Sequence, residues 1–442
     1  MSRSRTIVVL AGLLVAVAAS TGFGQSPFGT KAIAELPTAL DLTSLEQLAL
    51  QNNPTLVQAG AQITVSRGKA LQAGLYPNPI LGYQAELIGV NGTPGEFQGG
   101  FVQQTIVTAG KLRLSRAKYS QEAREAAILA LGQQLRVVNG VRTQFYELLA
   151  AKRMIVLRRD LVNNADENLR TTREMFNTGL ANEAQVLLAE NEVNRAKIGL
   201  AAQENQYSAF WQHLVALLGS PDLTPRPLDG QLELVGAPLE WDDSLNRLLA
   251  DSPELEAARA HVVHDQIAIQ RERVEPIPNI TIGAGVGHNF ENPGTNTNVQ
   301  AAIEVPLFDR NQGTLRQAQG DLVRSQAAVQ RVELSLRRQL ADYFNQYRTA
   351  LLTTEQYRDA MVPNASKAYE LQLAMYKQRR VAWPEVVDLQ RNLFQVQSDY
   401  TQSLVELRRA EVAITGLLMV DGLSPPTSPT PGDHLEATPT PR

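Results

Sequence analysis

The sequence contains no cysteine among its 442 residues. Disulfides, thiolate metal ligands and cysteine nucleophiles are therefore excluded together. We also expect no lipid anchor of the kind that is attached to a cysteine at a cleavage site. Aromatic residues make up only 6% of the chain, so a large conventional core is not expected, and small and aliphatic side chains must supply most of the packing.

The sequence also lacks an excess of either charge. Lys and Arg total 41 and Asp and Glu total 45, for a net charge of -4. This near balance gives no general attraction for nucleic acid, so we expect no nucleic-acid partner. A Gly-rich phosphate loop, a nucleophile elbow and a zinc-protease helix motif are absent from the sequence as well. We therefore predict that the protein is not an enzyme and needs no cofactor.

Long apolar runs are missing except for one at the start of the chain. Arg3 and Arg5 precede an apolar stretch over residues 6–19, which is shorter than the roughly 20 residues that a membrane-spanning helix needs. Small residues follow, and a peptidase could cut before Gln25. We predict a signal peptide over 1–24 and export of the chain. If the mature chain enters a membrane, it must do so as strands.

The chain does contain an internal repeat. Identical residues recur at one nearly constant spacing: Pro54 with Pro253, Pro77 with Pro276, Pro79 with Pro278, Val186 with Val386, and Leu217 with Leu417. Residues 41–219 and 240–420 are therefore predicted to be two copies of one unit. The Pro-rich segment 220–239 is an extended linker in this interpretation. The Pro/Thr-rich tail over 424–442 is expected to be disordered.

Each copy is predicted to contain long helices. Thr43 and Glu46 predict a capping box at the first of them, and the pair Asn53-Pro54 should break or kink it. Pro363 should kink a helix of the second copy. The longest proline-poor stretches predict helices over 111–177 and 184–218 in the first copy and over 313–377 and 384–418 in the second.

Apolar residues at every seventh position follow several of these helices. Val141, Leu148, Ile155 and Val162 form one such stripe. A seven-residue period predicts left-handed supercoiling against neighbouring helices. Helices alone would also fit an ordinary antiparallel coiled-coil rod.

A strand hairpin is predicted in each copy, over 80–106 and over 279–307. The strands are about 10 residues long, the span of a tilted membrane strand. Open sheet edges cannot face lipid and four strands cannot close a barrel, but three chains would supply twelve. Two soluble hairpins that cap a rod are the alternative. The alternating apolar residues are Tyr83, Ala85 and Leu87, then more weakly Phe97, Gly99 and Phe101, then Ile280, Ile282, Ala284 and Val286, and last Val299, Ala301, Ile303 and Val305.

Four segments carry a family resemblance: LYPNPILGY, FNTGLANEAQV, VPLFDRNQG and MYKQRRVAWPEVVDL. Over about residues 41–420 the chain resembles the TolC-like outer-membrane efflux proteins. LYPNP and VPLFDRNQG are most similar to the heavy-metal branch, which serves cobalt–zinc–cadmium or copper–silver efflux. The resemblance implies a mostly α fold with a membrane β-barrel. In a homotrimer, tandem-duplicated long helices would form an α-barrel, and four strands per chain would close a 12-stranded barrel.

The function that the resemblance implies is that of a passive exit duct in a tripartite efflux system, exporting toxic heavy-metal cations. The duct would sit in outer-membrane lipid and span the periplasm. Its partners would be a periplasmic adaptor protein and an inner-membrane, proton-driven pump. A soluble periplasmic coiled-coil structural or adaptor protein is the alternative. An adaptor, however, would be expected to carry a lipoyl-like or barrel domain and not to duplicate its whole unit.

The resemblance also implies a pore constriction. Glu385 and Asp388 match the family's acidic pair there, and their spacing places both on one helix face. A ring of such carboxylates attracts cations. Acidic residues after Pro384 also fit an ordinary helix start. Tyr376 matches a tyrosine that holds the tunnel shut, while its usually acidic neighbour is Gln185 here, which predicts a weaker or different lock.

The turns between the paired helices match the family's adaptor-contact tips. Gly179 and Leu180 match the turn motif near 179. The second turn, near 380, has Arg379 at the matching glycine position, followed by Arg380. These arginines could contact an acidic adaptor tip or be solvated charge at a helix end.

Metal binding by the chain itself is not predicted. His261 and His264 lie three apart on a predicted helix and could share a metal ion. No carboxylate-rich or third-histidine partner is apparent in the sequence. The two are therefore predicted to be a surface pair.

Overall fold

Long helices make up most of the structure, a computed structural model that describes residues 39–88, 96–234, 236–291, 293–378 and 380–429. The described residues belong to one unit that begins at Ala39. The predicted signal peptide over 1–24 and residues 430–442 of the predicted tail lie outside them. No helix among the described residues is both long enough and apolar enough to cross a bilayer.

The order of elements is the same in both halves of the chain, except that the longest helix of the first half corresponds to three consecutive helical elements in the second. The first half contains α1 (Leu42–Asn52), α2 (Pro54–Ala73), β2 (Ile80–Glu86), β3 (Phe97–Ile106), α3 (Lys111–Asn177) and α4 (Glu183–Leu217). The second half contains α5 (Trp241–Asp251), α6 (Pro253–Val274), β5 (Ile280–Asn289), β6 (Gly294–Ile303), α7 (Gln312–Gln356), the π-helix η2 (Tyr357–Met361), α8 (Val362–Lys377) and α9 (Trp383–Thr415).

Helix α1 begins at Leu42, and its capping residue lies two positions earlier than predicted. The capping box expected from Thr43 and Glu46 is wrong, because Asp41 is the capping residue and its carboxylate accepts a hydrogen bond from the Ser44 N–H at 3.2 Å. Asp41 also belongs to the short strand β1 (Leu40–Asp41). This strand pairs in parallel with β4 (Leu228–Asp229), so the predicted extended linker is tied back to the start of the first half.

Asn53 separates α1 from α2, as the Asn-Pro pair predicted. Its side-chain oxygen caps α2 by accepting from the Thr55 N–H at 2.9 Å. Its amide nitrogen donates to the Leu217 carbonyl at 2.7 Å, one of the last-turn carbonyls of α4 that a helix cannot satisfy itself. One buried side chain therefore joins the start of α2 to the end of α4.

The Asn53→Ala variant is expected to lose about 2–4 kcal/mol of unfolding free energy, the sum of a lost cap and a buried carbonyl left without a donor. Loss of helical circular dichroism in guanidinium measures this change. Asn52→Ala is the matched control, since Asn52 is exposed and makes a single 3.4 Å hydrogen bond to Ser220. Equal midpoints for the two variants would contradict the assigned role of Asn53.

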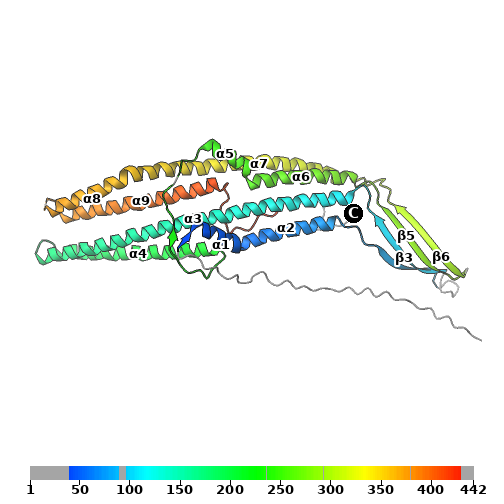
Figure 1. Ribbon diagram of the computed structural model, residues 1–442, viewed down its shortest axis with the longest axis horizontal. Helices are drawn as coiled ribbons and strands as arrows, with labels where there is room; N and C mark the ends of the chain where they lie inside the picture. Colours follow the sequence, from blue (N-terminus) through cyan, green and yellow to red (C-terminus); the bar gives the residue numbers. More distant parts are fainter. Residues whose placement is uncertain (1–38, 89–95, 235, 292, 379, 430–442) are drawn as a thin grey trace, which may run out of the picture. The chain divides into compact units, whose positions relative to one another are not determined.

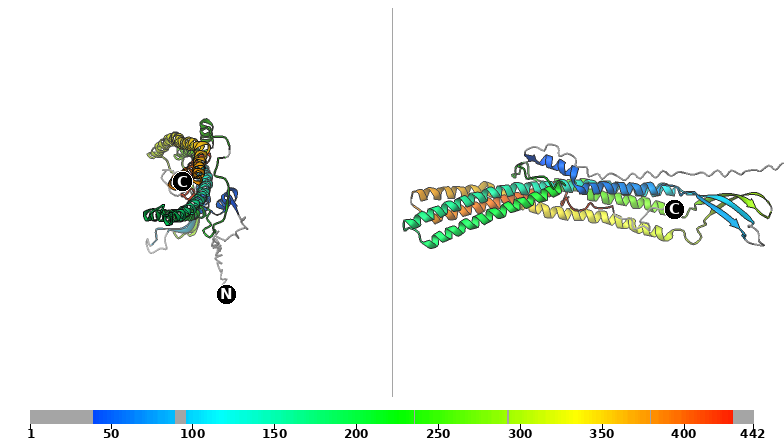
Figure 2. Two further views of the ribbon diagram at one scale, coloured as in Figure 1. Left: turned by 90° about the vertical axis from the view of Figure 1, so that its left-hand side faces the viewer. Right: turned by 90° about the horizontal axis from the view of Figure 1, so that it is seen from below.

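Helix α3 lies in the middle of a single layer of helices (Figure 1). Toward the sheet it packs between α2 and α6, and α6 packs on α7. Away from the sheet it packs between α4 and α9, and α9 packs on α7 and α8. The predicted seven-residue stripe faces these neighbours, because Val141, Leu148 and Val162 are buried. Figure 2 shows the same helices from two further directions.

One large buried cluster connects helices of the second half with one another and with the linker. Tyr347 is a fully buried member, and its hydroxyl accepts a hydrogen bond from the Leu239 N–H at 3.0 Å. Trp241 packs edge-on against Phe344 in the same cluster. The remaining buried members are aliphatic: Leu248, Leu255, Leu336, Leu340, Ala350, Leu407, Ala410, Ile414, Leu417 and Leu418.

Regular α-helix stops before Pro363, where a kink was predicted. The interruption is a π-helical turn, η2, that ends at Met361, and α8 resumes at Val362 with Pro363 in its first turn. Proline has no N–H to donate and its ring crowds the carbonyl four residues earlier. A wider π-turn relieves that crowding while the chain continues in the same direction.

The four longer strands form one antiparallel sheet in the order β2-β3-β5-β6. The central pair, β3 and β5, joins the two halves of the chain. The strands differ from the predicted bounds at their ends. Strand β2 stops at Glu86, because Leu87 adopts a positive φ of 53°. Strand β6 starts at Gly294, which pairs with Asn289 at the end of β5.

The register places most of the apolar strand residues on one face, since directly paired residues share a face. The same face also carries Gln98, Gln104, His288, Thr295 and Thr297. We define the apolar face by Leu81, Tyr83, Ala85, Val102, Ile106, Ile280, Ile282, Ala284, Val286, Val299, Ala301 and Ile303. Phe97 and Phe101 do not belong to it, so their assignment to the apolar set was wrong. Phe101 pairs with Gly82 on the opposite face, where the polar residues Gln84, Glu86, Asn296, Asn298 and Gln300 lie.

Candidate functional site

The turn between α3 and α4 is built around a left-handed glycine. Gly179 has a φ of 76°, a conformation that costs glycine little. The Leu180 N–H donates to the Met175 carbonyl at 2.8 Å, which satisfies an end carbonyl of α3. The Leu180 side chain is 74% exposed. The turn thus presents an apolar side chain on a fixed backbone.

The turn between α8 and α9 repeats this hydrogen bond. The Arg380 N–H donates to the Met375 carbonyl at 3.0 Å, in the position that Leu180 occupies in the first turn. The Arg380 side chain is exposed. Arg379 lies outside the described residues. The predicted difference between the two tips therefore remains a prediction.

The acidic pair lies at the start of α9, on its exposed side. Glu385 accepts a hydrogen bond from the Gln372 amide of α8 at 2.8 Å. Asp388 is 73% exposed and lies 3.4 Å from Arg391. Val386 and Val387, between them, are buried. The valines therefore hold α9 in place and the two carboxylates are directed outward.

Tyr376 and Gln185 each contact a residue close by in sequence. The Tyr376 ring lies 4.8 Å from the Trp383 ring, centroid to centroid. The Gln185 side chain accepts from the Asn182 N–H at 2.9 Å, and the Asn182 side chain accepts from the Gln185 N–H at 3.0 Å. Gln185 therefore completes a capping box at the start of α4.

A groove of about 380 Å³ lies between the two helical tips. It brings together Gln185 of the first half and Asp388 of the second, two of the predicted constriction residues. Asn168, Glu192, Trp383 and Arg391 line it as well. The groove is thus formed where α3 and α4 of the first half meet α9 of the second half.

Two side-chain contacts across this groove were not predicted from the sequence. The Trp383 indole N–H donates to the Asn168 side-chain oxygen of α3. Arg391 forms an ion pair with Glu192 of α4 at 3.0 Å. We call these two contacts the tip latch. A tryptophan directly before Pro384 was the available signal, but nothing in the sequence identified its partner.

The prediction of a surface histidine pair is wrong. His264 is 4% exposed and its neighbour Asp265 is 3% exposed, because α6 presses this face against α3. His261 is half-buried and its Nδ1 lies 3.1 Å from Glu125 of α3. Carboxylate partners therefore exist, one on the next residue of α6 and one on another helix. The first was visible in the sequence, and the second required the packing of α6 on α3.

Comparison with known proteins identifies one family. A family model described as "Outer membrane efflux protein" matches residues 45–220 and 244–418. The cobalt-zinc-cadmium resistance protein CzcC of Cupriavidus metallidurans is 25% identical over 427 residues, which covers 94% of this chain and 99% of CzcC. The pyoverdine export outer membrane protein OpmQ of Pseudomonas aeruginosa is 24% identical and covers 85% of this chain and 84% of its own.

Solved structures share the fold. A crystal structure of CusC superposes with a TM-score of 0.71 at 18% identity, covering 85% of this chain and 91% of CusC. The mostly helical architecture with few strands is therefore that of the TolC-like channels.

Proposed function

We propose a function from one premise: the chain belongs to the outer membrane efflux protein family, whose model matches both of its halves. We infer that it is the passive exit duct of a tripartite efflux system. Three copies would form a homotrimer whose twelve strands span the outer membrane and whose helices cross the periplasm. The duct exports toxic heavy-metal cations, and an inner-membrane, proton-driven pump supplies the energy through a periplasmic adaptor.

The observation that carries this proposal is the unfinished sheet. Within the described residues, β2 and β6 each pair on one side only. The apolar face suits contact with lipid, with Leu81 at 80% and Val299 at 75% exposure. Lipid cannot hydrogen-bond an open strand edge, and a closed barrel needs about eight strands or more. A trimer supplies twelve and leaves no edge.

The helices favour the same assembly. A single layer leaves large apolar side chains uncovered along its length, as at Leu131, Ile198 and Leu334, which are 57–69% exposed. Single exposed apolar residues are common, but a repeated series along packed helices indicates further partners. Neighbouring copies that continue the layer into a closed ring would cover them.

The helical tips are the proposed gate and docking end. Glu385 and Asp388 would form a ring of carboxylates, and Tyr376 and Gln185 would lie beside it. Leu180 and Gly179 of one turn, with Arg379 and Arg380 of the other, would contact the adaptor. The exposure of Leu180 and Arg380 and the defined backbone of both turns support this assignment.

The proposed cargo follows from the acidic pair and from one relative. CzcC is named for cobalt, zinc and cadmium resistance, whereas OpmQ is named for pyoverdine export. Exposed carboxylates at the constriction favour cations over anions. We therefore prefer metal cations to an organic export product.

The experiment tests two parts of the proposal, the assembly of the chain into an outer-membrane trimer and the export of metal cations. Membrane fractionation and gel migration without boiling are expected to give an outer-membrane band at the mass of three chains. Deletion of the gene is expected to sensitise cells to cobalt, zinc or cadmium, with rescue by the wild-type copy. A soluble monomer in the periplasm would instead support the alternative, a coiled-coil structural or adaptor protein. An outer-membrane trimer whose deletion changes no metal sensitivity would refute the proposal that the duct exports metal cations.

A further inference from the structure

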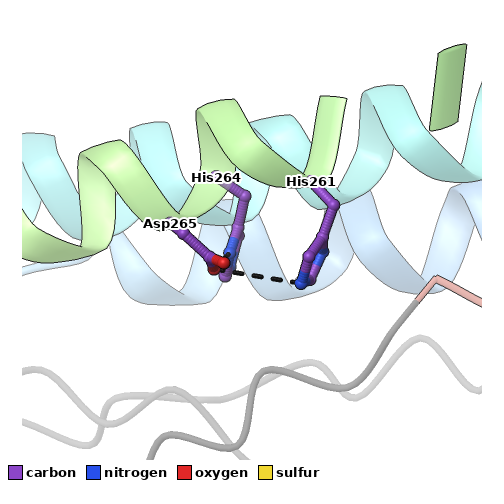
Figure 3. A group of neighbouring side chains, drawn as sticks. All are labelled: His261, His264 and Asp265. Atoms are coloured by element: carbon purple, nitrogen blue, oxygen red, sulfur yellow. Dashed lines mark hydrogen bonds and ion pairs between the residues drawn. The ribbon is translucent and has the colours of Figure 1, made fainter. Parts of the chain in front are cut away.

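A cluster of titratable side chains lies in the helical body, far along the chain from the tips. His261, His264 and Asp265 extend from one side of α6 (Figure 3). One ligand atom from each lies within 4.8 Å of the other two. The imidazole rings stack with their centroids 5.3 Å apart and their planes at 12°. Glu125 of α3 adjoins His261.

We propose that this cluster, the α6 histidine cluster, binds one divalent transition-metal ion of the Zn²⁺ and Co²⁺ class. His261, His264 and Asp265 are the ligands, and Glu125 orients His261. Two imidazoles and a carboxylate are a ligand set that suits these borderline ions. A tetrahedral site places its ligand atoms about 3.4 Å apart. Side-chain rotations that move the ligand atoms by about an ångström would bring them to this spacing.

The hydrogen bond of His261 is the one that a metal-binding histidine makes. Its Nδ1 lies 3.1 Å from the Glu125 carboxylate, while its Nε2 is directed at Asp265 Oδ1, 3.9 Å away. Metal-binding histidines commonly donate the second ring N–H to a carboxylate, which fixes the tautomer and leaves the other nitrogen for the ion. Glu125 therefore prepares Nε2 as the ligand atom.

Asp265 supplies an independent indication of a missing ligand. Its Oδ1 lies 3.0 Å from His264 Nδ1, but its Oδ2 is buried and has no hydrogen-bond partner. A buried carboxylate oxygen without a donor is costly. The oxygen that faces both imidazoles is Oδ1, so an ion bound there takes the place of the hydrogen that His264 and Asp265 share.

An open cavity lies beside His261, at one edge of the cluster. A cavity of about 660 Å³ is lined by Glu125 and His261 and also by Arg324 and Ser325 of α7. Arg324 opposes a cation there, but it is paired with Asp321 at 3.1 Å. Three protein ligands leave a fourth position for water, and the cavity provides the room for it.

Protons compete with the ion. Burial lowers the pKa of His261, but the Glu125 hydrogen bond and the charges of Glu125 and Asp265 outweigh it and raise the pKa on balance, against the opposing charge of Arg324. Only the neutral imidazole binds metal.

The test is Co²⁺ and Zn²⁺ binding to the full chain, purified in detergent without a polyhistidine tag and stripped with a chelator. We expect one ion per chain by calorimetry and a Co²⁺ visible spectrum of low coordination number. His264→Gln and Asp265→Asn are expected to abolish both signals. Glu125→Gln is expected to weaken binding about 10- to 100-fold, the usual effect of losing an orienting partner.

His213→Gln is the matched control, because His213 is exposed on α4 and outside the cluster. Pulsed electron paramagnetic resonance of Cu²⁺ on the wild-type protein detects imidazole ligands without any variant. Absence of binding, binding that survives His264→Gln, or wild-type spectra without imidazole would each overturn the proposal. These readouts do not depend on the proposed function, whose failure appears in fractionation and in cell growth.

Discussion

Replacing Trp383 and Arg391 with alanine together is expected to open the proposed channel at its helical tips. The double variant removes the tip latch, the hydrogen bond from Trp383 to Asn168 and the ion pair between Arg391 and Glu192. A half-exposed ion pair contributes up to about 1 kcal/mol, and the tryptophan contact contributes about 1–2 kcal/mol. A loss of about 2 kcal/mol per chain lowers the ratio of closed to open tips about 30-fold.

Conductance in planar lipid bilayers measures this change, and entry of a bulky antibiotic into cells provides a second readout. Arg338→Ala is the control, because its ion pair with Asp342 stays within one helix, α7. The single variants separate the two contacts. A double variant with wild-type conductance would show that the latch does not hold the tips together.

The second large effect is expected from Glu385→Gln combined with Asp388→Asn. In the proposed trimer this variant removes a ring of about six carboxylates. Two unit charges 8 Å apart in water interact by about 0.5 kcal/mol. Even after screening by salt, the ring should favour a cation by about 1.4 kcal/mol, so the cation-to-anion permeability ratio is expected to fall about tenfold.

Reversal potentials under a salt gradient measure the permeability ratio. Glu333→Gln with Asp342→Asn is the matched control, since these carboxylates are exposed on α7 away from the tips. Selectivity that is unchanged in the tip variant would mean that Glu385 and Asp388 serve only as favourable residues at a helix start. The Gln372 amide, which donates to Glu385, can accommodate glutamine there without a buried mismatch.

Elements dictated by local sequence could be predicted closely. Helix α3 spans Lys111–Asn177, as the absence of proline indicated. The capping residue of α1 could not be chosen, because Asp41 and Thr43 are both good caps and only the pairing of β1 with β4 makes Asp41 extended. Likewise, Phe97 and Phe101 alternate correctly, but the face they occupy depends on the register with β2 and β5.

The residues of the candidate sites also fall into those that local sequence identifies and those that depend on long-range packing. Motif positions such as Gly179 and Asp388 could be identified along the chain, because turns and helix starts are local. The tip latch and the α6 histidine cluster could not, because Asn168, Glu192 and Glu125 are polar residues of ordinary helices until α9 and α6 pack against them. Long-range packing therefore decides which of many similar polar side chains have partners.

The π-turn at η2 makes the two helical arms of the chain mechanically unequal. The arm of α3 is continuous through 67 residues, whereas the corresponding arm of the second half is interrupted between Gln356 and Val362. A π-turn is a local weak point in an otherwise stiff rod. Bending of the second arm would therefore concentrate at η2, whereas the α3 arm has no such point.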